Sequence, residues 1–344
     1  MNAAETQRLA DWLRTHVAPF DGDLKLTPLT GGQSNPTYRV DAGPHRWVLR
    51  RKPPGVLLAS AHAVDREYRV MAALAGTDVP VPRVHALCED DAVIGSTFVV
   101  MDLVEGRVFA DPSLPGLPAA ERGAVYDAMA RTLAAIHRVD VAAVGLAGHG
   151  KPQHYLTRQL DRWTRQYRAS ETERLEPMER LIEWLPAQLP AGLDDQPGTL
   201  VHGDFRIDNL IVHPSEPRVL AVIDWELSTL GHPLADLGYH LMAWRVTPDE
   251  FRGLVGHDLA ALGIPDEAAY LARYRAHGGR TAGTEDPATM RWIMAFNMFR
   301  MAAILQGILA RARQGNAAAA DAQATGERAR RMAEAGWRQM QAGT

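Results

Sequence analysis

The segment 200–225 constrains the fold and chemistry of this chain more than any other, because three kinds of polar side chain are spaced through it. Asp204 ends a His-Gly-Asp triplet, Asn209 follows five residues later, and Asp224 fifteen after that. Two short apolar runs separated by a turn-rich link predict a β-hairpin between them (210–212 and 219–223). The hairpin would bring Asn209, which precedes its first strand, beside Asp224, which follows its second.

These residue types suit phosphoryl transfer. A carboxylate on the loop before the hairpin, Asp204, can orient a substrate hydroxyl and accept its proton. The amide oxygen of Asn209 and the carboxylate of Asp224 can hold Mg²⁺ against nucleotide phosphates. Isolated loop residues of these types are common, whereas the ordered set closing one hairpin is not. The set therefore indicates a kinase-like site.

The segment resembles the aminoglycoside phosphotransferase family, which has His-Gly-Asp where protein kinases have His-Arg-Asp, and Ile-Asp where they have Asp-Phe-Gly. Residues 225–239 and 159–172 resemble one branch of it, the phosphotransferase domain fused to some acyl-CoA dehydrogenases. The resemblance implies an α+β fold, the two-lobed protein-kinase-like fold. Residues 1–104 would form a nucleotide-binding N-lobe with an N-terminal helix, a five-stranded antiparallel sheet and one further helix. Residues 105–344 would form a larger, mainly helical C-lobe with the catalytic loop and the acceptor site.

The resemblance also implies a reaction, the transfer of the γ-phosphoryl group of ATP, with GTP as an alternative, to a small-molecule hydroxyl. In it Asp204 would act on the acceptor hydroxyl, while Asn209 and Asp224 would bind Mg²⁺. A cation on the third strand would clamp phosphates, held by Glu67 on a helix near 60–75. Alignment of strand 46–51 places Arg50 where the family commonly has lysine.

The guanidinium of arginine is a planar fork of donors, whereas the ammonium of lysine is a compact point charge. Arg50 could therefore bind phosphate through two donors at once but would need more room than lysine. The alternative interpretation is that Arg50 belongs to a basic strand edge exposed to solvent and contacts no nucleotide. Arg51 should face the opposite side of the sheet, because side chains alternate along a strand.

Three further regions are expected to contact nucleotide. A glycine-rich turn at 30–38 resembles the phosphate-covering loop, with Ser34 as the first choice for a phosphate contact. At the hinge after strand 97–104, the Asp102 carbonyl and the Val104 amide are expected to contact adenine, with Met101 lining the pocket. The Asp102 side chain is expected to face solvent.

Helical periodicity dominates the rest of the chain. His137, at the end of the first C-lobe helix, is predicted to be a cap or a surface residue. Asp236 resembles the family aspartate that supports the catalytic loop from a helix start, and His232 is assigned no role. The predicted C-lobe helices are 118–139, 153–169, 173–189, 233–244, 249–262, 265–277, 287–313 and 316–341.

Composition excludes several classes of protein. The net charge of −4 creates no general attraction to nucleic acid or anionic membrane. One cysteine, Cys88, permits no intrachain disulfide and is expected to be a packed strand residue. The N-terminus lacks a signal-peptide pattern, and no uninterrupted apolar run reaches the ~18 residues of a membrane span. The expectation is a cytoplasmic protein with neither nucleic-acid nor membrane partners, and its oligomeric state is left open.

Regional charge bears on the acceptor. Residues 265–344 carry eleven arginines against seven acids, and residues 145–199 carry seven basic and eight acidic residues. Neither region is acidic enough to favour a polycationic acceptor such as an aminoglycoside. The resemblance to the acyl-CoA-dehydrogenase-associated branch implies instead a hydroxy acid or hydroxyacyl derivative. Two alternatives stay open: nucleotidyl transfer at the same site, and a nucleotide-binding pseudokinase or interaction module, which Arg50 in the lysine position leaves possible.

Overall fold

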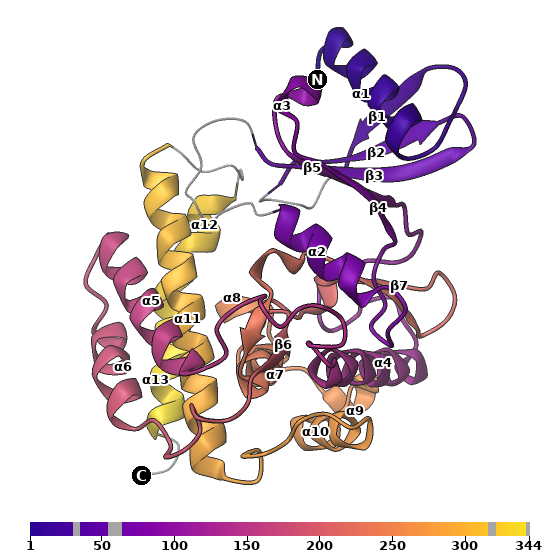
Figure 1. Ribbon diagram of the computed structural model, residues 1–344. Coiled ribbons are helices and arrows are strands. Elements are labelled where there is room, and N and C mark those ends of the chain that lie inside the picture. Colours follow the sequence, from indigo (N-terminus) through magenta and orange to yellow (C-terminus); the bar gives the residue numbers. More distant parts are fainter. Residues whose placement is uncertain (30–34, 54–63, 316–320, 342–344) are drawn as a thin grey trace.

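The protein has two lobes in the computed structural model, which describes residues 1–29, 35–53, 64–315 and 321–341 (Figure 1). The N-lobe contains a five-stranded antiparallel sheet with strand order β1-β2-β3-β5-β4. Its strands are β1 (Leu24–Pro28), β2 (Thr37–Ala42), β3 (His45–Arg51), β4 (Val84–Cys88) and β5 (Phe98–Asp102).

The two faces of this sheet pack in two separate hydrophobic clusters, because side chains alternate along each strand. Phe98 and Val100 of β5 pack in a cluster that also contains Leu9 and Leu13 of helix α1 (Ala3–His16). Val99 and the rest of the opposite face belong to a larger cluster that continues into the C-lobe. The sheet is therefore shared between a small outer core and the main core of the molecule.

Helix α2 (Val64–Leu74) lies between the sheet and the C-lobe, whereas α1 lies on the outer side of the sheet (Figure 1). The structure adds a short helix to the N-lobe, α3 (Asp91–Ile94), which the sequence interpretation of one helix besides α1 did not include. Asp90 caps its first turn by accepting a hydrogen bond from the Ala92 amide. A single turn is too short for hydrophobic periodicity to indicate it.

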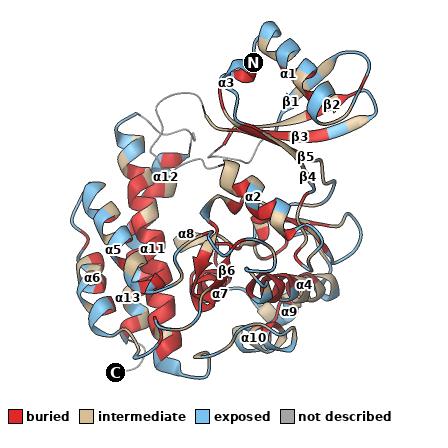
Figure 2. Ribbon diagram, viewed as in Figure 1, coloured by how far each residue is buried: buried red, intermediate tan, exposed pale blue. Residues whose placement is uncertain are grey.

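The C-lobe is mainly helical. Its long helix α11 is buried along most of its length (Figure 2), and by length and composition it could cross a membrane. However, 83% of its most apolar window is buried inside the protein, as in a core helix. The C-lobe helices are α4 (Ala119–Arg138), α5 (Tyr155–Ala169), α6 (Glu176–Ala187), α7 (Pro233–Leu241), α8 (Pro248–Phe251), α9 (Leu259–Leu262), α10 (Glu267–Ala276), α11 (Pro287–Arg313), α12 (Ala322–Gly326) and α13 (Ala329–Gln341).

Two of the predicted helices are each divided. The stretch 249–262 forms α8 and α9, because Arg252 adopts a left-handed backbone and Gly253 lies against Val246. A Cβ atom on Gly253 would stand 1.7 Å from the Val246 carbonyl oxygen, so only glycine permits the chain to approach Val246 this closely. In the described part of 316–341, α12 ends at Gly326 and α13 begins three residues later.

Two small antiparallel ribbons position the catalytic segment in the C-lobe. Strand β6 (Thr199–Val201) pairs with β9 (Thr229–Gly231), and β7 (Leu210–Val212) pairs with β8 (Val219–Val222). The predicted hairpin is therefore present, and the loop that contains Asp204 connects the two ribbons.

Candidate functional site

The hairpin brings together the residues expected to bind metal. Asn209 ends a 3₁₀ turn that precedes β7, and Asp224 follows β8. The Ile223 amide donates to the Asn209 carbonyl oxygen at 3.0 Å, so the peptide leading to Asp224 lies beside Asn209. Asp224 has a left-handed backbone with φ 67, which is uncommon outside glycine. Such strained backbone is often found at functional sites.

Asp204 is surrounded by hydrogen-bond donors. Its Oδ1 accepts from the Tyr239 hydroxyl at 2.5 Å, and its Oδ2 accepts from Asn209 Nδ2 at 3.0 Å. Arg206 Nη2 donates to Oδ2 at 3.1 Å, and Arg206 Nε lies 3.0 Å from Oδ1. Burial alone would raise the pKa of the Asp204 carboxyl, but Arg206 and Tyr239 outweigh burial and hold it below its ordinary value. Asp204 is therefore ionised at neutral pH.

Asp236 holds the loop that carries Asp204, as the resemblance implied. From the first turn of α7 its two carboxylate oxygens accept the His202 amide at 2.7 Å and the Gly203 amide at 2.8 Å. Burial opposes ionisation of Asp236, yet His137 and His202 keep its pKa lowered. His232, to which the sequence assigned no role, caps α7 by accepting a hydrogen bond from the Leu234 amide.

His137 is neither a surface residue nor a simple helix cap, contrary to the sequence prediction. It is fully buried, with Nε2 at 3.3 Å from Asp236 Oδ2 and Nδ1 at 2.7 Å from the Tyr274 hydroxyl. Its neighbours in space are about 100 or more residues away along the chain. Position at a helix end could not reveal a partner so distant.

Arg50 reaches from the sheet to its predicted partner, Glu67, and also to Asp224, which the sequence predicted only as a metal ligand. Its Nη2 donates to Asp224 Oδ1 at 2.6 Å, and its Nε lies 2.9 Å from Glu67 Oε2, an ion pair without hydrogen-bond geometry. Burial opposes the charge of Arg50, but the nearby carboxylates outweigh it and raise its pKa. Burial raises the pKa of the Glu67 carboxyl, which Arg50 only partly offsets. Arg51 faces the other side of the sheet, where it donates to Ser96 and to the Ile94 carbonyl. Arg50 is itself buried, so it does not belong to a solvated strand edge.

Glu226 is a site residue that sequence reasoning did not identify. Its Oε2 accepts from the buried Asn35 Nδ2 at 3.1 Å and lies 3.9 Å from Arg50 Nη2. Asn35 belongs to the N-lobe segment 30–38 and Glu226 to the C-lobe, so this hydrogen bond joins the two lobes at the site. The only signal in the sequence is the spacing from Asp224, two residues earlier, and a single acid at that spacing is not specific.

The structure places three of the four remaining residues that were predicted to contact nucleotide. Met101 is buried, and the Val104 amide donates no hydrogen bond within the described part of the chain. The Asp102 side chain does not simply face solvent, because His85 Nε2 lies 2.6 Å from its Oδ1. Ser34 lies outside the described residues.

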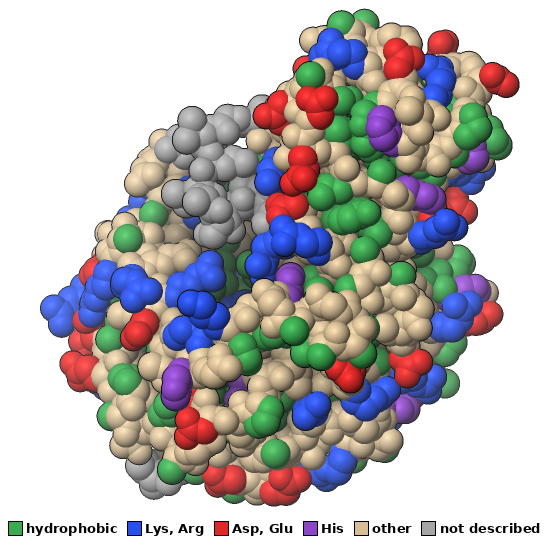
Figure 3. Space-filling model, in the orientation of Figure 1, with side chains coloured by type: hydrophobic (Ala, Val, Ile, Leu, Met, Phe, Trp, Pro, Cys, Tyr) green, Lys and Arg blue, Asp and Glu red, His purple; other side chains and the backbone are tan. Residues whose placement is uncertain are grey.

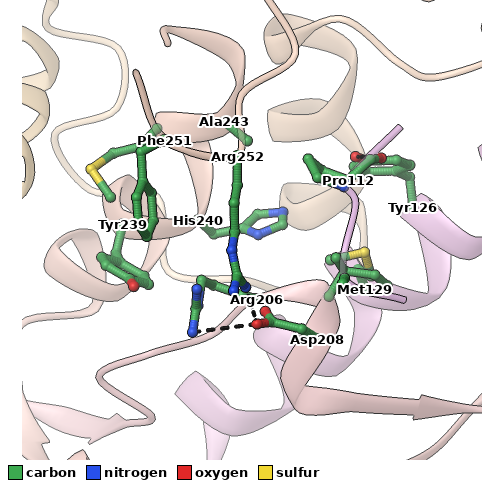
Figure 4. Close-up of a pocket in the computed structure, with 13 residues that line it drawn as sticks. Pro112, Tyr126, Met129, Arg206, Asp208, Tyr239, His240, Ala243, Phe251 and Arg252 are labelled. Atoms are coloured by element: carbon green, nitrogen blue, oxygen red, sulfur yellow. Dashed lines mark hydrogen bonds and ion pairs between the residues drawn. The ribbon is translucent and has the colours of Figure 1, made fainter. Parts of the chain in front are cut away.

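A small cavity adjoins the catalytic loop (Figure 4). Arg206 and Tyr239, which both contact Asp204, form part of its wall. Asp208 pairs with Arg206 and Arg252 at its edge. The free space is about 50 Å³, whereas a cavity of about 150 Å³ is needed to hold benzene. The cavity lies directly against two of the side chains that hold the Asp204 carboxylate.

Three buried histidines predict acid sensitivity. Burial lowers the pKa of His149, His232 and His240 to about 4. Between pH 6.5 and 4 the unfolded chain therefore binds protons at these sites that the folded protein does not, and stability falls as the pH is lowered. Above pH 6.5 these groups contribute no pH dependence.

His232→Asn tests this expectation, since asparagine can still cap α7 but does not titrate. Between pH 7 and pH 5 the variant should lose about 2 kcal/mol less stability than the parent protein. Urea unfolding of both proteins at pH 7, 6 and 5 measures the difference, in which contributions from other groups cancel. Equal losses in the two proteins would contradict a depressed pKa for His232.

Comparison with known proteins is consistent with this geometry. Residues 25–293 match the model of the phosphotransferase enzyme family. The chain is 47% identical over 321 residues to mouse acyl-CoA dehydrogenase family member 10, covering 92% of this chain and 29% of that protein. It is 43% identical over 320 residues to the probable acyl-CoA dehydrogenase IBR3 of Arabidopsis thaliana, covering 89% of this chain and 38% of the relative. The chain thus spans about a third of the length of these two relatives.

Solved structures agree on the fold. A crystal structure from Ralstonia eutropha, provisionally assigned as an aminoglycoside phosphotransferase, superposes with a TM-score of 0.86 at 49% identity, covering 98% of each chain. A thermostable mutant of the aminoglycoside phosphotransferase APH(4)-Ia superposes with a TM-score of 0.61 at 18% identity, covering 98% of this chain and 100% of the other. The second likeness supports the fold alone. The match across most of the chain shows that this protein belongs to the phosphotransferase enzyme family and has its two-lobed, kinase-like fold.

Proposed function

We propose that the protein transfers the γ-phosphoryl group of ATP, with Mg²⁺, to a hydroxyl of a small molecule. One observation carries the proposal: the β7–β8 hairpin brings Asn209 beside the peptide leading to Asp224, and Arg50 reaches Asp224 from the N-lobe. The APH(4)-Ia structures include ternary complexes with ADP or AMP-PNP and hygromycin B, which supports ATP as the donor for this fold. GTP remains an alternative donor.

The donor set fits Mg²⁺. Asn209 Nδ2 donates to Asp204, which leaves the side-chain oxygen of Asn209 available as a ligand beside Asp224. Among the described residues no group of three or more His, Cys, Asp or Glu could hold a metal ion. That suits Mg²⁺, which is usually held by one or two protein side chains, waters and substrate phosphates. When bound, the ion would neutralise charge on the transferring phosphoryl group.

The protein groups would act in a defined way. Asp204, ionised and fixed by Tyr239, Arg206 and Asn209, would accept a hydrogen bond from the acceptor hydroxyl and take its proton. Its lowered pKa keeps the carboxylate ionised and able to accept this proton. Arg50 would exchange part of its contact with Asp224 for phosphate oxygens, and Glu67 would keep its guanidinium in place.

The acceptor is proposed to be neutral or anionic, such as a hydroxy acid or hydroxyacyl derivative. On the face shown in Figure 3, Lys and Arg side chains gather on the C-lobe near its boundary with the N-lobe. Among the described residues, Arg158, Arg162 and Arg165 of α5 form no ion pair with an acid. Such a surface repels a polycation. Phosphorylation of kanamycin as fast as that of hydroxy acids would contradict this proposal.

The first test is binding of Mg-ATP. A ligand that binds only the folded state stabilises it and so raises the melting temperature. At a hundredfold excess over its Kd, the gain in the free energy of unfolding is about 2.7 kcal/mol. Thermal unfolding should therefore shift upward with millimolar ATP and Mg²⁺ together, and less with either alone. A folded protein that shows no shift with Mg-ATP would lack the proposed site.

A nucleotide-binding protein without transfer activity is the second candidate. The observation in its favour is the ion pair at 2.6 Å between Arg50 and Asp224, which occupies a carboxylate proposed to bind metal. Phosphate release from Mg-ATP, measured with and without hydroxylated metabolites, separates the two. Binding without any turnover would favour the inactive protein.

A further inference from the structure

Arg300 of α11 is a buried cation whose charge no carboxylate balances within ion-pair distance among the described residues. Arg300 is 5% exposed, and its Nε has no hydrogen-bond partner in the part of the chain that the structure describes. Removing an unpaired charge from water is costly. The contacts that its guanidinium does make must therefore account for its position.

The first contact is with the backbone that carries Asp204. Arg300 Nη2 donates to the Gly203 carbonyl oxygen at 2.6 Å. That carbonyl and the Asp204 amide belong to one peptide group, and the amide donates to His202 Nδ1 at 3.2 Å. The plane of this peptide sets the direction in which the Asp204 side chain leaves the backbone. Gly203 has φ 83, and a Cβ atom there would stand 2.7 Å from the Leu227 carbonyl oxygen.

The second contact reaches the side chain of Asp204. The Arg300 guanidinium carbon lies 5.4 Å from the centre of the Tyr239 ring and 5.6 Å from the Trp163 ring. A cation against an aromatic ring is attracted by its negative face, and this attraction offsets part of the cost of burial. The Tyr239 hydroxyl donates to Asp204 Oδ1. Arg300 thus restrains both the peptide and the hydrogen-bond donor that define the position of the carboxylate.

We propose that Arg300 is a positioning residue for Asp204, acting through the Gly203 carbonyl and the Tyr239 ring rather than by contact with substrate. This inference rests on the proposed function, in which Asp204 is the proton acceptor. The proposal also links α11 to the chemical step. This helix packs against α5 and α7, and through Arg300 it would hold Asp204 in place from the protein interior. A purely structural Arg300 would stabilise the fold without affecting the chemical step.

Arg300→Met tests the proposal, since methionine fills the space without charge or donors. Hydrolysis of Mg-ATP by water provides the turnover assay. The variant should lose about 10–100-fold in kcat, the loss typical of a base displaced by about 1 Å, while the KM for ATP is unchanged. Combining it with Tyr239→Phe should give less than the product of the two separate losses, because both act on Asp204.

Gln306→Met is the matched control. Gln306 is buried on the same helix and donates to the Ser170 carbonyl oxygen at 3.2 Å, away from Asp204. Both variants should lower the melting temperature, but only Arg300→Met should lower kcat. An unchanged kcat in Arg300→Met, or a parallel rise in the KM for ATP, overturns the proposal. If the methionine variant does not fold, Arg300→Lys, which keeps the charge but loses the planar fork, takes its place with the same criteria.

A second readout does not depend on turnover. Hydrogen exchange at the Asp204 amide should accelerate in the Arg300 variant and stay unchanged in Gln306→Met; equal protection in both overturns the proposal. A parent protein that turns over Mg-ATP neither alone nor with any hydroxylated metabolite would refute the proposed function, whereas an Arg300 variant equal to an active parent would refute only this inference.

Discussion

Asp224→Ala is expected to abolish turnover and to weaken Mg-ATP binding by at least roughly 10–100-fold, the loss typical of removing even an indirect metal partner. Two effects combine in this variant. The carboxylate proposed to bind metal disappears, and Arg50 loses the acceptor that its Nη2 contacts at 2.6 Å. Glu67 and Glu226 remain near Arg50, and neither replaces the carboxylate beside Asn209.

Calorimetric titration with ATP, in the presence and absence of Mg²⁺, measures this effect. The loss should be large with Mg²⁺ and small without it. Asp208→Asn is a suitable control, because Asp208 pairs with Arg206 and Arg252 near the same loop and is not proposed to bind metal. Asp224→Asn checks that backbone strain is not responsible, since asparagine tolerates the left-handed conformation of this position. Undiminished Mg-ATP affinity in Asp224→Ala would remove Asp224 from the metal site.

Asp204→Asn is expected to reduce turnover by ~10²–10⁴-fold, the usual cost of losing a positioned proton acceptor. Its affinity for Mg-ATP should stay close to that of the parent, because Asp204 is proposed to act on the acceptor hydroxyl and not on the nucleotide. The loss should appear in kcat and kcat/KM together, as for an interaction gained mainly in the transition state.

The structure adds a stability cost to this variant. The groups around the carboxylate are all donors in their present arrangement: Arg206, Asn209 and Tyr239. An asparagine amide would direct its own donor at one of them, so the melting temperature should also fall. Tyr239→Phe keeps the proton acceptor and should lose less activity. If Asp204→Asn weakens nucleotide binding as severely as Asp224→Ala, the two roles are assigned wrongly.

The sequence could predict the parts of the site that depend on local geometry. The relation of Asn209 to Asp224 follows from a short hairpin, and the opposite directions of Arg50 and Arg51 follow from the two-residue period of a strand. The pairing of Arg50 with Glu67 was inferred from a family resemblance, and the two side chains do meet.

Contacts between distant segments could not be read in this way. His137 meets Asp236 across 99 residues, and Arg300 meets Gly203 across 97. His137 and Arg300 each lie on a helix, and the periodicity of a helix does not reveal which distant residue a polar side chain meets. The break between α8 and α9 had a related cause, because the close approach of Gly253 to Val246 depends on how the chain folds back.

The division of the N-lobe sheet between two hydrophobic clusters has a consequence for how the protein opens. One face of β5 packs in the core that the two lobes share, so separating the lobes would disrupt the interior of both. The outer face packs against α1, α3 and Phe20, in a cluster that includes no C-lobe residue among those the structure describes. We therefore expect the N-terminal helix to open locally at a lower free-energy cost than the strand that carries Arg50, which also packs in the shared core.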